Sequence, residues 1–335
     1  AIVWRLPAAE PELVESLRAL TNLETQRYFV WSSHTLYERP ADLYMHLVNG
    51  HVYENHEVWP RYWRVCSELD ACALYFILSG LHLATGKNLY NLLKQQVVYS
   101  VLDRQAEDGG WYHGEWTDNM ESHYRLVNGA VTMLSSYYEE SDDGKVRAAL
   151  TRATAFLVDR AQQLDTGIWF VHDSLESGDE KIANYPFPRS KSTALGKSTS
   201  NMLILNTHLD TTIALDRHAQ VTGDEQYRET IVSAEQSARA VLGLRAAESL
   251  YRLLFWILDM TLLSKDKAIQ LPLPLRVLKR LGWKYLCPKL HQFKTAFPRL
   301  VMPNGFIDRS LCQKGFSTRY QSVHVWDLVR FVRRF

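Results

Sequence analysis

The feature that most constrains the fold of this chain is a polar loop that recurs at nearly constant spacing. The runs NGHVYENHEVW, DGGWYHGEW and DTGIWFVHDSLE begin at Asn49, Asp108 and Asp165, so their starts lie 59 and then 57 residues apart. A shorter run, NGFIDRS, begins at Asn304. Each run opens with Asn or Asp close to Gly, passes through an apolar or aromatic residue and then becomes acidic. A period of this length predicts a stack or ring of helix pairs that gathers its loops on one face.

The segments between the loops predict helices in pairs. Apolar residues recur at three- and four-residue spacing over 61–84 and 88–105, over 119–140 and 145–163, and over 199–221 and 225–248. Each pair is divided by a turn sequence that contains Gly, a common helix terminator: Thr85-Gly86, Asp143-Gly144 and Thr222-Gly223. No alternating run is long enough to predict a sheet.

We therefore expect an all-α chain of antiparallel helix hairpins. An open solenoid and a closed (α/α) toroid both satisfy the pattern. The toroid, as an incomplete barrel of hairpins, is favoured because the repeats diverge and because the loops all follow the second helix of a pair. In a toroid these loops surround the mouth of a central cavity. We expect hairpin repeats over residues 1–248 and a basic amphipathic segment over 249–335 that completes the toroid.

The succession helix, TG-x-x-Tyr, helix, DGGW loop resembles the (α/α) toroid families that act on carbohydrates. These include the glucuronyl C5-epimerase and N-acylglucosamine 2-epimerase groups and the toroid domains of polysaccharide lyases. The segment NTHLDTTIALDRHAQVTGDEQY, residues 206–227, looks like an inner helix and its turn from those families. The resemblance covers roughly residues 40–248 and implies sugar chemistry. QAEDGGW is also similar to a repeat of triterpene cyclases, but the acidic DxDD motif of that family is absent.

The charges are unevenly distributed along the chain. Residues 265–335 carry fifteen Lys or Arg against three Asp and no Glu, a balance of +12, whereas residues 1–264 balance at −11. Such a split predicts an anionic partner for the C-terminal part, and docking of this part on the acidic remainder of the chain is the alternative.

The longest apolar run, LYRLLFWILDMTLL over residues 250–263, is too short to span a bilayer. Together with the basic stretch LPLPLRVLKRLGWKYL it predicts a segment that lies in a membrane interface, or else a buried helix. An anionic membrane surface or glycolipid is thus a candidate partner of residues 250–335.

Four cysteines without a CxxC pair predict reduced thiols and a cytoplasmic location, with the surface of the inner membrane as the alternative. No signal peptide is visible, although a leader removed ahead of Ala1 is left open.

The loops supply the candidate site residues, because carboxylates and imidazoles transfer protons while aromatic faces stack on sugar rings. The candidate catalytic residues are Glu57, Tyr112, His113, Glu115 and His172. The candidate substrate-binding residues are His51, Tyr53, His56, Trp111, Trp116, Asp118, His123, Tyr124, Arg125, Trp169, Asp173, His208, Asp210, Asp308 and Arg309. Those at helix starts have capping and solvation as the alternative reading.

Three other kinds of site are less well supported. The loop histidines and carboxylates could hold zinc or manganese, but no HExxH-like motif appears, and we expect no cofactor. Gly196-Lys197-Ser198 lacks the earlier Gly and the strand of a phosphate-binding loop. Nucleic acid is not expected as a partner, because the rest of the chain is acidic.

These patterns predict a carbohydrate-active protein of bacterial surface polysaccharide or glycolipid metabolism. Lyase, epimerase or hydrolase chemistry on a uronic acid or similar sugar is the leading expectation. The alternative is a non-catalytic binding or assembly protein of polysaccharide or lipopolysaccharide biosynthesis, associated with the membrane surface, which uses the same groove to hold a glycan or a partner.

Overall fold

A computed structural model describes residues 40–49, 52–54, 63–114 and 116–335. The chain divides into two compact units. The first comprises Ala1–Arg160, Asp173–Leu175 and Ile213–Arg228, and the second comprises Ala161–His172, Glu176–Thr212 and Glu229–Phe335.

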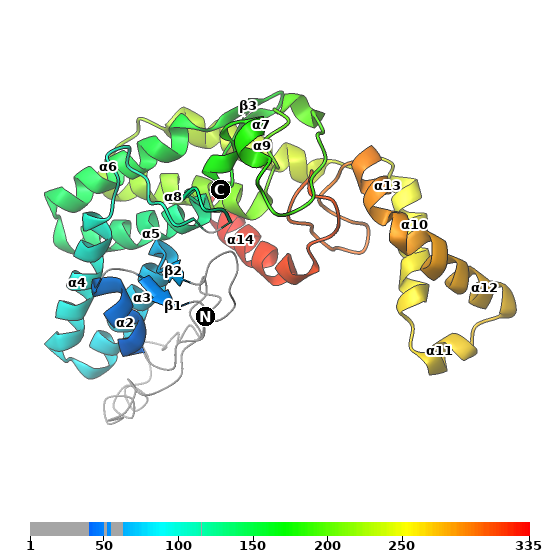
Figure 1. Cartoon of the computed structure of the whole chain (residues 1–335), viewed down its shortest axis with the longest axis horizontal. Helices are drawn as coiled ribbons and strands as arrows, with labels where there is room; N and C mark the ends of the chain where they lie inside the picture. The colour runs from blue at the N-terminus through cyan, green and yellow to red at the C-terminus, as the bar shows by residue number, and fades with distance from the viewer. Residues whose placement is uncertain (1–39, 50–51, 55–62, 115) are drawn as a thin grey trace. The chain divides into compact units, whose positions relative to one another are not determined.

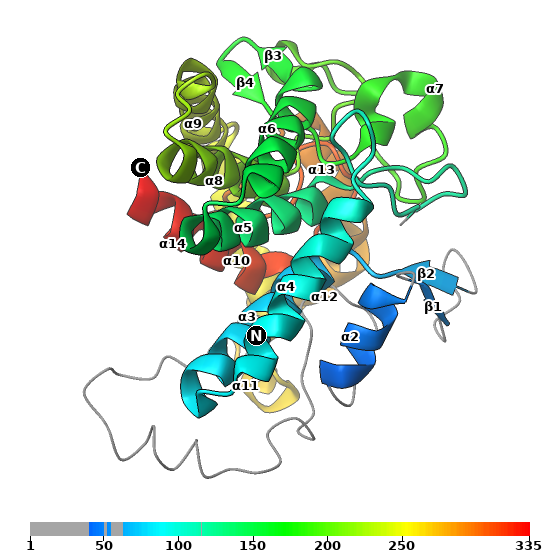
Figure 2. The same ribbon diagram turned by 90° about the vertical axis from the view of Figure 1, so that its left-hand side faces the viewer.

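The first unit is a set of helix hairpins (Figure 1). It contains α2 (Pro40–Val48), α3 (Glu68–Thr85), α4 (Asn88–Asp103), α5 (Tyr124–Ser141) and α6 (Gly144–Asp159). Helix α3 packs against both α4 and α5, and α5 packs against α6. Figure 2 shows α3 and α4 lying side by side, with the short strands β1 (Val52–Glu54) and β2 (Trp63–Val65) beyond α2. These strands pair antiparallel, with Val52 opposite Val65.

Local signals set the helix ends. Ser67 begins α3 through a capping box in which its hydroxyl accepts from the Asp70 N–H while the Asp70 carboxylate accepts from the Ser67 N–H. Gly86 ends α3 in the left-handed region, at φ +67°. Asp143 begins α6, and its carboxylate accepts from the Lys145 N–H at 2.8 Å. The predicted turns therefore do what their residue types favour.

Helix α5 is an inner helix, because its buried residues run without a break from Tyr124 to Val131. It approaches α3 closely at Gly129, where a Cβ would lie 2.7 Å from the Leu69 Cα. Helix α8 (Leu205–Thr222) is likewise buried throughout its first twelve residues, Leu205 to Asp216. Polar side chains on both helices therefore lie inside the protein, where each needs a partner.

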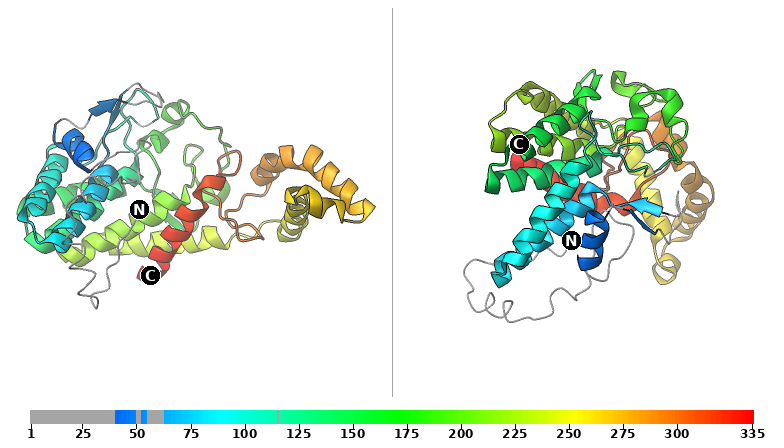
Figure 3. Two further views of the ribbon diagram at one scale, coloured as in Figure 1. Left: turned by 90° about the horizontal axis from the view of Figure 1, so that it is seen from below. Right: turned by 60° about the vertical axis from the view of Figure 1, so that its left-hand side comes forward.

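The second unit begins with the hairpin of β3 (Gln162–Leu164) and β4 (Gly167–Trp169), which places Gln162 opposite Trp169. Its helices are α7 (Asp179–Ile182), the first part of α8, α9 (Arg228–Gly243), α10 (Glu248–Leu262), α11 (Lys265–Ile269), α12 (Leu273–Leu281), α13 (Leu290–Ala296) and α14 (Gln321–Arg334). Figure 3 shows α10 and α12 side by side in the yellow to orange part of the chain, where they pack against each other and against a π-helical turn, Gly282–Leu286. A small core of Tyr251, Phe255 and Met302 holds α10 to the loop before α14.

The prediction of an all-α chain of paired helices is confirmed, and the six expected helices match α3, α4, α5, α6, α8 and α9. Two details differ. The helix expected over 61–84 begins only at Glu68, because the capping box of Ser67 starts it there, and residues 63–65 form a strand. The helix expected over 145–163 ends at Asp159, and its last residues enter β3. Within the described ranges no helix is long and apolar enough to cross a membrane.

Candidate functional site

The loop between α4 and α5, which we call loop two (Gln105–Ser122), is held against α6 by its two glycines. Gly109 has φ +90°, and a Cβ there would collide with the carbonyl oxygen of Arg152. A Cβ on Gly110 would lie 2.5 Å from the ring of Phe156. The Gln105 amide also donates to the carbonyl oxygen of Ala149 on α6, at 2.9 Å. Only glycine fits at either position of the pair.

The loop that follows α6, which we call loop three (Ala161–Asp173), is held against α9 in the same way. Gly167 has φ +127°, and a Cβ there would lie 2.5 Å from the Ser233 carbonyl oxygen. The tryptophans that follow the glycines, Trp111 and Trp169, are both fully buried. Trp111 donates its indole N–H to the Val101 carbonyl at 2.9 Å. In both loops a glycine turn is therefore held against a later helix and is followed by a buried tryptophan.

This burial does not fit the expectation that Trp111 and Trp169 stack on a sugar. Neither ring has an exposed face, because each fills the space between its loop and the helices beneath it. Both tryptophans were predicted to bind a sugar because of their residue type alone. Aromatic residues beside a glycine turn pack in the core as readily as they bind a ligand.

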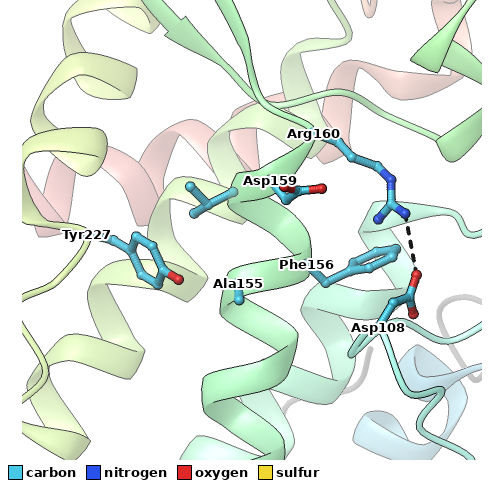
Figure 4. A pocket seen from close by; sticks show the side chains of 7 residues that line it. Asp108, Ala155, Phe156, Asp159, Arg160 and Tyr227 are labelled. Atoms are coloured by element: carbon cyan, nitrogen blue, oxygen red, sulfur yellow. Dashed lines mark hydrogen bonds and ion pairs between the residues drawn. The ribbon is translucent and has the colours of Figure 1, made fainter.

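A pocket of about 410 Å³ opens beside loop two, within the usual range of about 300–1,000 Å³ for small-molecule sites. Its lining residues are Asp108, Ala155, Phe156, Val158, Asp159, Arg160 and Tyr227. Figure 4 shows the guanidinium of Arg160 above the ring of Phe156 and the carboxylate of Asp108 beside it, with Tyr227 on the far side of Ala155.

Four side chains define the geometry at one end of this pocket. The guanidinium carbon of Arg160 lies 4.4 Å from the centroid of the Phe156 ring, a cation–π contact. Arg160 Nη2 donates to Asp108 Oδ2 at 3.4 Å, and the Tyr112 hydroxyl donates to the same oxygen at 2.5 Å. The Tyr112 ring meets Phe156 edge to face, with centroids 6.3 Å apart. Tyr112, a predicted catalytic residue, therefore lies at the edge of the pocket.

The charge states follow from these contacts. Burial raises the pKa of Asp108, but hydrogen bonds from Tyr112, from the Gly110 N–H and from Arg160 outweigh it and hold this pKa below its ordinary value. Burial and the hydrogen bond to Asp108 raise the pKa of Tyr112 to about 12. At neutral pH the pocket therefore presents a carboxylate, a guanidinium and a neutral phenol, so that Tyr112 is able to donate a proton but not to accept one.

Tyr124 lies behind this group at the start of α5, with its ring centroid 5.4 Å from that of Phe156. It is fully buried, and burial raises its pKa far above the usual value, although Arg160 lowers it. Tyr124 thus supports the Phe156 ring from inside the protein and is not exposed to a ligand.

His113 points away from the pocket. Its Nε2 pairs with the buried carboxylate of Glu68, which also accepts from Arg104 Nη1 at 3.2 Å. Burial raises the pKa of Glu68, but the charges of His113 and Arg104 lower it by more, so the carboxyl stays ionised. This network fastens loop two to the start of α3.

The end of loop two is joined to Asp173, the last residue of loop three, and to Ser174, all within the first unit. His123 and Asp173 form an antiparallel β-bridge, and the Ser174 N–H donates to the Ser122 carbonyl at 2.9 Å. The His123 ring also accepts from the Arg125 N–H at 3.2 Å as the cap of α5. The structure therefore brings three predicted residues, His123, Arg125 and Asp173, to one place.

The remaining predicted residues of this loop differ in exposure. Trp116 is half-buried, and its backbone N–H donates to the carboxylate of Glu121. Asp118 is exposed. Glu121, which was not predicted, is buried and also accepts from the Thr117 N–H and hydroxyl. It fixes the turn that carries Trp116 and Asp118.

A second polar cluster lies in the second unit around His172. Its Nδ1 lies 2.5 Å from the Thr207 hydroxyl, and its Nε2 lies 2.7 Å from Arg309 Nη2. The guanidinium of Arg309 can only donate hydrogen bonds, so Nε2 of His172 is the acceptor. In a neutral imidazole the proton is then on Nδ1. Arg309 also stacks over the ring of Tyr320, at 4.5 Å. The prediction that His172 and Arg309 share a site is supported by this contact, but with both nitrogens engaged His172 positions Arg309.

Three other predicted residues of this unit are bound to the fold. Asp308 is buried in an ion pair with Lys294, and Asp210 pairs with Arg330 at 2.8 Å. His208 is fully buried, with its ring stacked 3.8 Å from that of Trp169. Its Nδ1 accepts from the Phe170 N–H, and its Nε2–H donates to the Ala234 carbonyl. Burial lowers the pKa of His208 to about 3, which keeps the ring neutral and leaves it no proton to exchange near neutral pH.

Several candidates belong to the recurring loop that begins at Asn49, which is only partly described. His51, His56, Glu57 and, in loop two, Glu115 lie outside the described residues. Tyr53 belongs to β1. Among the described residues, no group of three or more His, Cys, Asp or Glu side chains is arranged to hold a metal ion.

Among the pocket residues, Asp108, Phe156, Arg160 and Tyr227 are absent from the predicted site. One signal for Arg160 was available. An Arg occupies the C-cap of α4 and again of α6, at Arg104 and Arg160, just ahead of the two repeated loops. Phe156 and Tyr227 carry no such signal, since each occupies an ordinary helical or turn position.

No protein-family model matches the chain, and no curated protein matches it. The solved structures that are similar to it include two from glycoside hydrolase family 76. One is a glycoside hydrolase family 76 mannosidase, Bt3792 from Bacteroides thetaiotaomicron, at 12% identity and a TM-score of 0.38, covering 80% of this chain and 69% of that one. The other is the family 76 alpha-mannanase BT2949 from the same organism, at 12% identity and a TM-score of 0.40, covering 96% and 93%. At these values the similarity says nothing of activity.

Proposed function

We propose that this chain is a carbohydrate-active protein that binds a sugar ring in the pocket beside loop two. The observation that carries the proposal is the convergence of Asp108, Tyr112 and Arg160 around the ring of Phe156. A carboxylate and a phenol hydrogen-bond to ring hydroxyls, and the neighbouring apolar surface accepts the C–H face of the sugar.

A uronic acid is the sugar that this pocket favours. In the described part of the chain, Arg160 makes a single long hydrogen bond, from Nη2 to Asp108, and it is only partly buried. Arg160 lines the pocket, and a guanidinium binds a carboxylate through two parallel hydrogen bonds.

The same groups define the chemistry available to an enzyme. Arg160 would neutralise a uronate carboxylate, which makes the adjacent C–H more acidic, and Tyr112 would supply a proton to the departing or newly formed group. Asp108 is ionised and is therefore the base or the stabiliser of positive charge. Lyase, epimerase and hydrolase reactions all draw on this set, and Glu115 remains a candidate to complete it.

The first experiment measures binding. Titration of uronic-acid oligosaccharides and of neutral mannose oligosaccharides into the protein would be followed by calorimetry, with the Arg160→Gln, Asp108→Asn and Tyr112→Phe variants. Arg160→Gln should weaken binding of the acidic ligand by about 10- to 150-fold, the range for a hydrogen bond to a charged group, and should affect the neutral ligand less. Arg239→Gln, an exposed residue of α9 paired with Glu235, is the matched control. Equal affinities of Arg160→Gln and wild type for the acidic sugar would reject the pocket.

The second experiment separates an enzyme from a binding protein, the alternative favoured by the inward-facing positions of His113 and His172. Turnover would be measured as new reducing ends, as the absorbance of an unsaturated product, and as deuterium incorporation at the sugar carbon. An enzyme should lose turnover in Asp108→Asn or Tyr112→Phe while still binding sugar. Tight binding by the wild type without any of the three products would establish the non-catalytic role.

A further inference from the structure

Helix α10 has two apolar faces, and only one of them is covered. Tyr251, Phe255 and Leu258 face the small core that includes Met302. On the opposite side Leu250, Leu253 and Trp256 are exposed at three-residue spacing. A surface helix needs only one apolar stripe to pack on its protein, so the second stripe requires another explanation.

Helix α12 repeats the arrangement. Leu273, Val277 and Leu281 lie four residues apart and are all exposed, with Leu273 at 70%. Such spacing places the three side chains along one face of the helix. Trp283 and Tyr285 follow in the π-helical turn and are also exposed. The helix is packed against α10 through Gly282, where a Cβ would lie 2.6 Å from Ile257 Cγ2, so its outward face is fixed by the fold.

Basic residues are frequent in the same segment of the chain. Residues 249–297 contain nine Lys or Arg and two Asp, a balance of +7. Lys294 is buried with Asp308, and Lys279 donates to the Leu263 carbonyl, which ties α12 to the end of α10. The remaining seven are exposed: Arg252, Lys265, Lys267, Arg276, Arg280, Lys284 and Lys289.

The geometry points to a docking surface for an anionic lipid bilayer, formed by the exposed stripes of α10 and α12 and the basic residues beside them. We call this surface the α10–α12 face. Helix α12 has nine residues and a length of about 13 Å, so it lies in the plane of the interface and does not cross a hydrocarbon core of about 30 Å. Leucine and tryptophan enter the boundary between headgroups and acyl chains, while Lys and Arg reach the lipid phosphates.

The composition of the face favours lipid over a protein partner. Four of the seven exposed basic residues are lysines. Lysine is depleted in protein–protein interfaces, whereas arginine is enriched there, and the cores of such interfaces contain few charges. An anionic bilayer accepts both the lysines and the apolar stripes without a complementary shape.

The experiment measures sedimentation of the full chain with vesicles at low and at high salt. One set of vesicles is neutral phosphatidylcholine, and the other is phosphatidylcholine with about 30% anionic phosphatidylglycerol. Binding should need the anionic lipid and should weaken as salt screens the charges. Arg276→Gln with Arg280→Gln should weaken it about 30-fold, since each basic residue near an anionic surface contributes about fivefold. Leu273→Ser with Val277→Ser should abolish it.

Two controls protect the interpretation. Leu83→Ser changes a leucine of α3 that is as exposed as Leu273, at 73%, and should leave vesicle binding unchanged. Brominated lipid should quench tryptophan fluorescence of the wild type, and Trp256→Phe with Trp283→Phe should remove that quenching while binding persists. Trp326→Phe, which changes an exposed residue of α14, should not remove it.

Absence of wild-type sedimentation with anionic vesicles at low salt overturns the proposal. So does unchanged binding by the Leu273→Ser, Val277→Ser protein. If light scattering instead finds a dimer that these two substitutions convert to a monomer, without lipid binding, the face joins two copies of the chain and the lipid assignment is rejected.

Discussion

Because of His208, the free energy of unfolding of this protein should fall at acidic pH, and the His208→Gln substitution should remove that dependence. Its pKa is about 3 in the folded protein because the ring is fully buried, and the ordinary value of 6.5 is restored on unfolding. Between these two values the unfolded chain binds a proton that the folded protein does not bind. The free energy of unfolding therefore falls as the pH falls below about 6.5, by up to about 1.4 kcal/mol per pH unit.

The size of the effect follows from the two pKa values. Between pH 7.5 and pH 5.0 the contribution of His208 amounts to about 2 kcal/mol. His208→Gln keeps an acceptor for the Phe170 N–H and a donor for the Ala234 carbonyl but does not titrate. This variant should be less stable than the wild type at pH 7.5, because the stack on Trp169 is lost, and the difference should shrink by about 2 kcal/mol at pH 5.0.

Urea unfolding followed by circular dichroism at several pH values between 7.5 and 5.0 measures this difference. Arg239→Gln on α9 has no group that titrates in this range and should keep the wild-type slope. Parallel stability profiles for His208→Gln and the wild type would refute the reasoning, because they would mean that His208 is protonated in the folded protein or is not buried there.

Two further predictions concern stability and are measured by the same unfolding assay. Gly109→Ala should destabilise the protein by more than about 2 kcal/mol, because it adds a collision with α6 to the cost of a left-handed backbone. Gly305→Ala, with φ +83° and no atom near its Cβ, should cost only about 1 kcal/mol. Equal costs would mean that loop two does not rest on α6. Lys294→Met should lower the free energy of unfolding by about 3–5 kcal/mol, because it leaves Asp308 buried without a cation. Arg252→Gln removes only an exposed ion pair and should lower it by less than about 1 kcal/mol. A small effect of Lys294→Met would mean that Asp308 is in contact with water.

The helices were predictable because their signals are local. Apolar spacing, the Gly at position 86 and the Asp at position 143 act within a few residues, and the structure places turns at both. The start of α3 was missed for a related reason. Its apolar pattern continues back through Trp63, and only the pairing of Ser67 with Asp70 distinguishes the strand from the helix.

The site was less predictable because it depends on contacts between residues distant in the sequence. His113 and Tyr112 are neighbours in one loop, yet one turns inward to Glu68 and the other outward to Asp108. The two residues are adjacent, and the carboxylates that they contact lie 45 and 4 residues away along the chain, so the local pattern does not show which side chain turns inward. Arg160 reaches the pocket from the end of a different helix, 52 residues away from its partner Asp108.

The glycines of loops two and three carry a consequence for how such a chain could be recombined. Loop two follows α4 in sequence but is moulded on α6, and loop three follows α6 but is moulded on α9. Each loop therefore does not rest on the hairpin that it follows in sequence. It rests on a helix of the next hairpin. An exchange that transplants α5 and α6 with the loop after them would bring loop three into the recipient and leave the α9 on which it rests behind in the donor. Successful chimeras should instead be cut ahead of each Asp-Gly turn, so that a loop travels with the helix it rests on.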